Sequence, residues 1–424
     1  MLPRSHSRDV PKPPGFLLVA TLTTADRQRW IMLGLLSVAL VLSMAVWFSA
    51  TAVVPELAAR FHLSPMAASL MTIAVQIGFV VGAVGSSLVN LPDIIPLRVL
   101  MSAAAVGAAL ANAVILVAPS VSLVIAARLA TGLCLAGVYP QAMKLIATWF
   151  ASKRGLALGV LTGALTLGSA LPHLVRASGG AGAATVVSVS STATLLGGVL
   201  IAAFAKEGPF PFRRAVFDPR QIGLVLRNRA VVLASLGYFG HMWELYAMWS
   251  WFLAYTRAAL AAQGWTAGTT LSFITFGVIA IGAVGCVLAG VMSDGLGRTA
   301  TTMAMMTASG LCALLIGCSF AGPLWLFLAI AAVWGITVIG DSAQFSAIVT
   351  EVGDSRYVGT ALALQLGLGF LLTVVTIWLV PAVAELAGWR WVFLVLVPGP
   401  VLGTAAMAVL RRLPEAVQIA GGRR

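Results

Sequence analysis

Long apolar runs separated by short polar connections make up most of the sequence. A helix needs about 20 mostly apolar residues to cross the hydrocarbon core of a bilayer, and runs of this length recur along the chain. The pattern predicts twelve membrane-spanning helices at 30–54, 66–89, 96–117, 120–142, 155–175, 182–205, 230–256, 268–292, 299–320, 323–349, 357–381 and 389–410.

One connection is much longer than the others. Residues 206–229, with the sequence KEGPFPFRRAVFDPRQIGLVLRNR, are polar, basic and contain prolines. This segment divides the predicted helices into two sets of six. We therefore predict an N-terminal half at 30–205 and a C-terminal half at 230–410, with tails at 1–29 and 411–424.

The composition indicates which solvent surrounds these helices. Hydrophobic residues make up 60% of the chain and charged residues 9%, whereas an ordinary soluble chain is roughly 25% charged. We expect an all-α integral membrane protein in the lipid bilayer, which excludes soluble enzymes, secreted scaffolds and disordered proteins. The four cysteines lie in apolar runs without the spacing of metal ligands, so we expect neither a metal site nor a disulfide framework.

The positive charges predict the orientation of the helices. Lys and Arg concentrate in the connections that share a side with the N-terminus, whereas the other side carries only Arg60, Arg176, Arg257 and Arg390. Because positive loops stay in the cytoplasm, we expect both termini and the central loop to be cytoplasmic, in a plasma (inner) membrane. This distribution accounts for the net charge of +13 without a nucleic acid partner.

The two predicted halves contain matching patterns at nearly constant spacing. The matches are GAVG at 82–85 and 282–285, Arg98 and Arg298, and GLALGVLTG at 155–163 with GTALALQLG at 359–367. Several matches in the same order indicate an internal duplication. Parallel duplicated halves with a binding site between them are an architecture of transporters.

A short acid–base motif follows the second predicted helix of each half. In the C-terminal half it reads GVMSDGLGRT, with Asp294 and Arg298, and in the N-terminal half SLVNLPDIIPLR keeps Asp93 and Arg98 without the glycines. Such a turn predicts a latch between helices, because an acidic side chain is stabilised near a helix N-terminus. We interpret all four residues as gating residues that do not contact the solute.

These motifs, the duplicated helices and the long central loop resemble the major facilitator superfamily over nearly the whole chain. Arg128 and Gly132 match the R-x-x-x-G pattern of the family's fourth helix, and GVYPQAMKLIATWFASKRGLALG looks like helices 4 and 5 of porters for small anions. The resemblance implies a secondary transporter that works by rocker-switch alternating access. It also implies that helices 1, 4, 7 and 10 line a central cavity, and that glycine-rich helices 2 with 11 and 5 with 8 form the contact between halves.

Arg128 is the candidate contact for an anion. Charged side chains inside a membrane are costly and usually face a protein interior or a wet cavity, and the planar guanidinium suits a carboxylate or a similar oxyanion. Trp249, Gln141 and Gln344 are further candidate substrate contacts. A structural role for Arg128 stays open, in which it ties its helix to neighbouring backbone carbonyls.

His241 and Glu244 are candidate proton-coupling residues. They lie three residues apart in GYFGHMWELYAMWSWFLAYT and so share one face of a helix. Histidine titrates near neutral pH, and removal from water favours the protonated form of a carboxyl group. The resemblance implies that both residues, with Asp341 and Arg128, face the cavity. Structural alternatives are an ion pair of Glu244 with Arg128, a satisfied interior histidine, and a helix cap at Asp341.

The sequence contains no nucleotide-binding loop, no zinc-protease motif and no catalytic triad, so we expect no cofactor and no enzymatic activity. We expect a monomeric secondary transporter that couples a small anionic solute to protons. Two alternatives remain. One is an exporter of amphipathic compounds, which the tryptophan-rich segment 237–256 would suit, and the other is a non-transporting membrane sensor with the same fold.

Overall fold

The structure of this chain is a computed structural model that describes residues 24–150, 153–179, 182–210, 217–265, 268–354 and 356–423. All regular elements in these ranges are helices. The elements of the N-terminal half are α1 (Thr24–Met44), α2 (Ser49–Ala52), α3 (Val54–Phe61), α4 (Pro65–Leu88), α5 (Leu91–Ile94), α6 (Leu97–Ala113), η1 (Val114–Leu116), α7 (Val121–Leu135), α8 (Tyr139–Ala147), α9 (Arg154–Ala177) and α10 (Ala183–Phe204).

The C-terminal half is built in the same way. Its elements are η2 (Pro219–Gln221), α11 (Ile222–Arg227), α12 (Arg229–Ala262), α13 (Gly268–Ala280), α14 (Gly282–Leu296), α15 (Arg298–Leu315), η3 (Ile316–Ser319), α16 (Leu324–Gly340), α17 (Ser342–Val352), α18 (Val358–Ala387), η4 (Val392–Leu396), α19 (Pro398–Arg412) and η5 (Pro414–Gly422).

The helices confirm the predicted all-α membrane fold. Within the described ranges, eleven helical segments are long and apolar enough to cross a bilayer, and α12 with the short helix before it, bent by 96°, makes a twelfth. Each segment matches one of the twelve predicted runs. The predicted central loop 206–229 differs in part, because Pro219–Arg227 is helical. Most of the predicted tail 1–29 lies outside the described residues.

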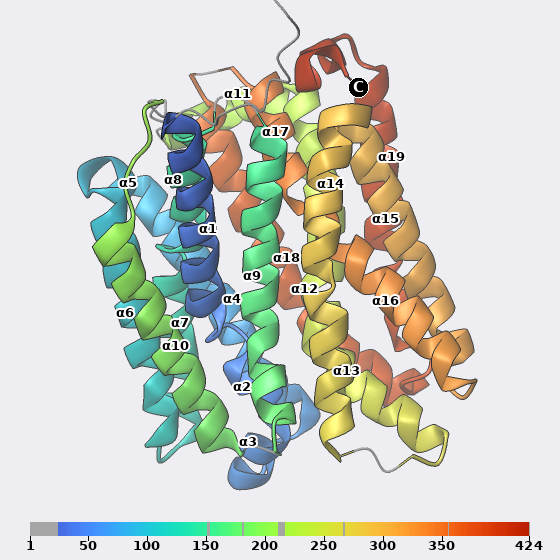
Figure 1. Ribbon diagram of the computed structural model, residues 1–424. Coiled ribbons are helices and arrows are strands. Elements are labelled where there is room, and N and C mark those ends of the chain that lie inside the picture. The colour runs from blue at the N-terminus through green and yellow to red at the C-terminus, as the bar shows by residue number, and fades with distance from the viewer. Residues whose placement is uncertain are drawn as a thin grey trace, which may run out of the picture.

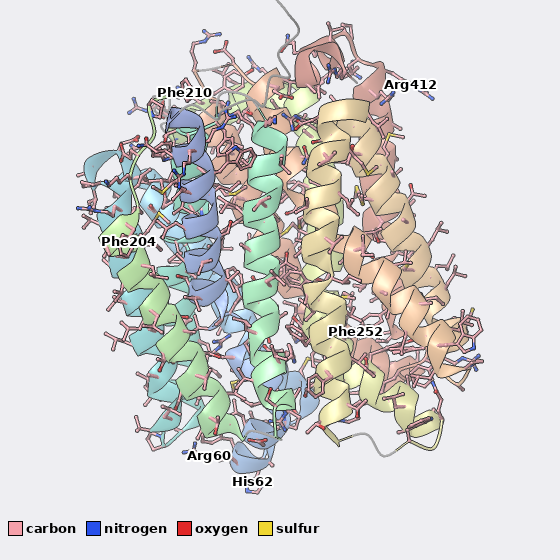
Figure 2. All side chains as sticks on the ribbon, viewed as in Figure 1. Arg60, His62, Phe204, Phe210, Phe252 and Arg412 are labelled. Carbon is pink, nitrogen blue, oxygen red and sulfur yellow. The ribbon has the colours of Figure 1, made fainter. Side chains whose placement is uncertain are left out.

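The helices run side by side in one bundle with two ends (Figure 1). The C-terminal end, α11 and α17 lie at one end, which we call the terminal face. The segments α3 and α13 lie at the other end, which we call the opposite face. Figure 2 shows the labelled side chain of Arg412 at the terminal face and those of Arg60 and His62 at the opposite face.

Four spans that the sequence predicts as continuous helices are divided between α-helices inside the bundle, and one of them is the span of α13 and α14, divided at Ile281. The predicted helix 30–54 ends at Met44 and resumes at Ser49. The span of α7 and α8 is interrupted before Tyr139, and Pro140 in the first turn of α8 explains this break because proline has no N–H to donate. The span of α16 and α17 is interrupted at Asp341.

The two halves meet along two pairs of helices. In one pair α9 packs against α13 and α14, and in the other α18 packs against α4. The approach is close, because a β-carbon added to Gly159 would lie 2.5 Å from the carbonyl oxygen of Cys286. These are the predicted contacts of helices 5 with 8 and 2 with 11, and glycine permits the short distance between their backbones.

Candidate functional site

An imidazole and a carboxylate are buried next to each other in the C-terminal half. Nδ1 of His241, on α12, lies 2.9 Å from Oδ1 of Asp341, and the two side chains are 2% and 1% exposed. Asp341 is the residue at the break between α16 and α17. Nε2 of His241 and Oδ2 of Asp341 have no hydrogen-bond partner among the described residues. The pair therefore keeps a free imidazole nitrogen and a free carboxylate oxygen inside the protein.

Glu244 lies one helical turn further along α12 and is 2% exposed. Its Oε2 accepts a hydrogen bond from the Ser309 hydroxyl at 2.8 Å, and its Oε1 accepts one from Nε1 of Trp334 at 2.7 Å. These donors come from α15 and α16. Glu244 forms no ion pair with a described residue, so the alternative of a permanent pair with Arg128 is not found in this conformation.

His241, Glu244 and Asp341 together form what we call the acid–histidine cluster. It combines two carboxyl groups and one imidazole in a place with almost no exposed surface. A buried unpaired charge costs several kcal/mol, on the order that drives a group to bind or release a proton instead. No lysine or arginine of the described chain lies within hydrogen-bonding distance of the two carboxyl groups. The cluster is therefore chemically suited to exchanging protons.

Arg128 lies in the N-terminal half and is fully buried on α7. Its Nη1 donates to the carbonyl of Val46 at 2.8 Å, its Nη2 donates to the carbonyl of Trp47, and its Nε donates to the carbonyl of Met71 at 3.1 Å. Nη1 also lies 3.1 Å from Oδ1 of Asn112. Every guanidinium nitrogen thus already donates to an oxygen of the same half.

These contacts explain the break in the first span. Residues 45–48 contain neither glycine nor proline, but the carbonyls of Val46 and Trp47 point to Arg128 and do not close a regular helix. Irregular backbone at membrane depth requires such internal partners, because lipid cannot donate hydrogen bonds. In this conformation Arg128 occupies the structural role that the sequence left open.

Trp249 is part of an aromatic cluster that crosses between the halves. Its members are Trp47, Phe48 and Phe79 from the N-terminal half and Tyr246, Trp249 and Phe370 from the C-terminal half. Neighbouring ring centroids lie 4.4–6.3 Å apart, with Phe79 and Phe370 closest. All six side chains are buried. The cluster therefore closes the space between the halves in the middle of the bundle.

The two glutamines proposed as substrate contacts lie apart from each other. Gln141 is buried on α8, at 6% exposure. Gln344 is buried on α17, where its Oε1 accepts a hydrogen bond from Nη1 of Arg298 at 2.7 Å. The structure thus groups Gln344 with a predicted gating residue.

Arg298 forms the centre of a network at the terminal face. Its Nε and Nη2 donate to the carboxylate of Glu351 at 2.9–3.0 Å, in addition to the bond to Gln344. The residue before it, Gly297, has a φ of 94°, a conformation that favours glycine. Arg298 therefore joins α15 to α17 within one half.

Asp294 makes the contact between halves at this face. A β-carbon added to Gly155 would lie 2.6 Å from Oδ1 of Asp294 and 3.0 Å from Oγ of Ser293. Gly155 is in the first turn of α9, where the backbone N–H groups and the helix dipole favour a negative charge. The acid of the C-terminal half thus lies at a helix N-terminus of the N-terminal half, as its motif predicts.

The C-terminal segment η5 covers the same network. The N–H of Ala420 donates to Oε2 of Glu351 at 3.0 Å, and Nη1 of Arg423 donates to the carbonyl of Asp294. The side chain of Ile419, which belongs to this segment, is fully buried. The described part of the predicted tail 411–424 is therefore packed against the Arg298 network and Asp294.

The corresponding residues of the N-terminal half are arranged differently. Asp93 forms an ion pair with Lys144 of α8 at 2.7 Å, and Arg98 is exposed and does not pair with Asp93. Here the acid joins two elements of its own half. The motif of the N-terminal half, which lacks the glycines, therefore does not repeat the contact that Asp294 makes between the halves.

Sequence reasoning did not select Glu351, Lys144, Ser309 or Trp334 as site residues. Glu351 is one of only 13 acidic residues in the chain, and its place just beyond the end of the predicted helix 323–349 was the available signal. Ser309 and Trp334 gave no signal, because residues of these two types recur along the predicted helices. Only the packing of three helices brings them to Glu244.

No curated protein matches the chain. The family model described as Major Facilitator Superfamily matches residues 35–294, which is more than half of the chain. Together with the duplicated helical bundle, this match shows that the chain belongs to the major facilitator superfamily.

Proposed function

We propose that this secondary transporter moves a small anion across the membrane together with protons, by alternating access between its two halves. The observation that carries the proposal is Glu244, a carboxyl group buried among Ser309 and Trp334 without a cationic partner among the described residues. His241, which lies one turn before it on α12, pairs with Asp341. This arrangement supports a proton-binding site inside the C-terminal half.

Electrostatics then links the proton to an anion. An anion that passes within about 4–6 Å of an ionised carboxylate of this cluster during the cycle would be repelled by roughly 3–4 kcal/mol at an effective dielectric constant of 20. Protonation of the acid–histidine cluster removes this repulsion, so an anion would be favoured only after a proton has bound. A cation would instead compete with the proton, and the two would be exchanged in opposite directions.

The charge of the lining between the halves favours the anion. Among the described residues that line the cavity between the N-terminal half and α12, Arg257 is the charged one and no carboxylate is present. The aromatic cluster favours the alternative, export of an amphipathic cation, because aromatic rings bind cations on their faces. The two functions predict opposite responses to a proton gradient.

In the proposed cycle the two halves rock about the contacts of α4 with α18 and α9 with α14. The Asp294 contact at Gly155 would hold the terminal face closed in this conformation, with Arg298 and Glu351 bracing α15 on α17. We infer that the terminal face is cytoplasmic, since α11 of the central loop and the C-terminal segment, which both carry basic residues, lie there. In this cycle Arg128 would maintain the break in the first span. Its guanidinium could bind solute only in a conformation in which one of its hydrogen bonds to a backbone carbonyl is broken.

The test is transport in proteoliposomes with an imposed pH gradient. We expect wild-type protein to accumulate a small anion when protons flow inward, and Glu244→Gln to keep solute exchange at equal pH but lose gradient-driven accumulation. The same substitution at Glu385, an exposed residue of α18, is the matched control and should leave accumulation unchanged. Efflux of an amphipathic cation driven by the inward proton gradient would establish the alternative instead.

A further inference from the structure

A small cavity lies between the two halves near the opposite face. Its volume is about 60 Å³. One wall comes from α2, α3 and the start of α4, and the other comes from residues 250–257 of α12. Thr51 and Ser250 follow Phe48 and Trp249 in the sequence, so the cavity adjoins the aromatic cluster on the side of the opposite face.

Arg257 gives this cavity its charge. Among the described lining residues it is the charged one. It is exposed, and it forms no hydrogen bond or ion pair with any residue that the structure describes. A guanidinium carries five N–H donors in a planar fork, and at Arg257 all of them are available to a ligand.

The other arginines of the opposite face are already engaged. Arg60 and Arg390 donate to backbone carbonyls at 2.8 and 3.2 Å, and Arg176 forms an ion pair with Glu56 at 2.6 Å. Arg257 therefore differs from its neighbours in having no structural partner in the described chain.

Two hydroxyl groups add a neutral donor to the cavity. Oγ1 of Thr51 and Oγ1 of Thr72 lie 2.7 Å apart, and both side chains are buried. Only one hydroxyl can donate within this pair, so the proton of the other is left for an outside acceptor. Ser69 and Ser250 also line the cavity, but they donate to carbonyls of their own helices at 2.7 and 2.5 Å. The threonine pair is therefore the neutral donor that a ligand can use.

We propose that this cavity is a capture site for a small oxyanion, bound by the guanidinium of Arg257 and by the free hydroxyl of the Thr51–Thr72 pair. A buried water needs roughly 10–15 Å³, so the cavity holds an anion of about four heavy atoms, such as a short carboxylate or a planar inorganic oxyanion. Because Arg257 and the threonines belong to different halves, a bound anion bridges them. This inference rests on the proposed function in that the captured ion is taken to be the transported solute.

The test is ligand-dependent thermal stability of the purified full chain with formate, acetate and nitrate as probes, since a ligand that binds the folded state raises its melting temperature. The variants are Arg257→Gln, Arg257→Lys and Thr72→Val. Arg60→Gln is the matched control, because it removes the same charge from the same face. Arg257 has no partner among the described residues, so its variants should unfold at the wild-type temperature without ligand.

We expect at least one probe to stabilise the wild type, and Arg257→Gln to weaken its apparent affinity by about tenfold or more, as loss of a charge-assisted hydrogen bond predicts. Arg257→Lys should restore only part of the affinity, Thr72→Val should weaken it less, and Arg60→Gln should leave it unchanged. If a probe stabilises the wild type and Arg257→Gln equally, the capture site is wrong while anion transport stands. If no probe anion stabilises the wild type and none is transported, the proposed function fails with it.

Discussion

A β-carbon added to Gly155 would lie 2.6 Å from Oδ1 of Asp294, so a carboxylate of one half rests directly on the helix start of the other. The distance leaves no room for a side chain between them. The partial positive charge at the N-terminus of α9 stabilises the carboxylate there, by about 0.3–1 kcal/mol for an ordinary helix end. The contact is therefore small in energy and easily broken, which suits the gating role proposed for Asp294.

Gly155→Ala should open the terminal face. The added methyl group displaces the Asp294 carboxylate from α9, which removes the attraction that holds the halves together there. The measurement is the rate at which a membrane-impermeant maleimide labels a cysteine introduced at Ser293, which is fully buried, in a background without the native cysteines. We expect faster labelling in Gly155→Ala. Gly277→Ala is the control, because a β-carbon at Gly277 meets no atom within 4 Å, and equal rates in the two variants would contradict the gate.

Deletion of the C-terminal segment after Leu413 should open the terminal face, as Gly155→Ala should. The truncation deletes the Ala420 N–H that donates to Glu351 and the Arg423 side chain that donates to the Asp294 carbonyl. We expect a lower melting temperature and faster labelling at the Ser293 position. The effect of Glu351→Gln should be smaller in the truncated chain than in the full chain, because both changes act on one network. Strictly additive effects would show that the segment and the network are independent.

Arg128→Met should destabilise the protein severely. It removes the charged donors to the carbonyls of Val46, Trp47 and Met71. Of these, the Val46 carbonyl keeps a hydrogen bond from the Ser49 hydroxyl at 3.0 Å. Each lost charge-assisted bond costs on the order of 1.5–3 kcal/mol, so the sum should reach at least about 3 kcal/mol in unfolding free energy. Arg128→Lys should rescue little, since one ammonium cannot replace a fork that reaches three carbonyls. Thermal unfolding with and without a stabilising anion separates this effect from loss of solute binding.

The case of Arg128 shows how far the sequence could lead. The spans were predictable because a bilayer demands long apolar runs, and the shared face of His241 and Glu244 follows from helix geometry. The break at 45–48 was not predictable, because its sequence contains no helix breaker and its carbonyls are satisfied by an arginine about 80 residues away. The hydrogen bond between Gln344 and Arg298 was not predictable for the same reason, because only the packing of α15 on α17 brings the two side chains together.

The site was predictable in part for the same physical reason. Charged residues inside apolar runs are few, which singled out Asp341 with the pair on α12. The chemistry of Glu244 depends on Ser309 and Trp334, and residues of these types occur throughout the membrane helices. To single out Ser309 and Trp334, one must know how three helices are rotated relative to one another, and a single sequence does not contain this information.

Phe370→Ala should lower the barrier between conformations. Phe370 lies 4.4 Å from Phe79 and 5.2 Å from Tyr246, as measured between ring centroids, and it joins the halves through the aromatic cluster. Truncation of a buried phenylalanine costs about 3–5 kcal/mol in a protein core. Part of this loss falls on the closed conformation alone, because the rings must separate before a solute can pass. We expect faster solute exchange at equal pH per folded molecule.

Phe252→Ala is the matched control for this prediction. Phe252 is also fully buried, but its partner Phe327, at 6.2 Å, belongs to the same half. Its removal should lower the melting temperature by a similar amount without raising the exchange rate, because the packing it supports is kept when the halves move. If Phe252→Ala accelerates exchange as much as Phe370→Ala, the acceleration comes from general loosening of the bundle, and the aromatic cluster is not the barrier between the halves.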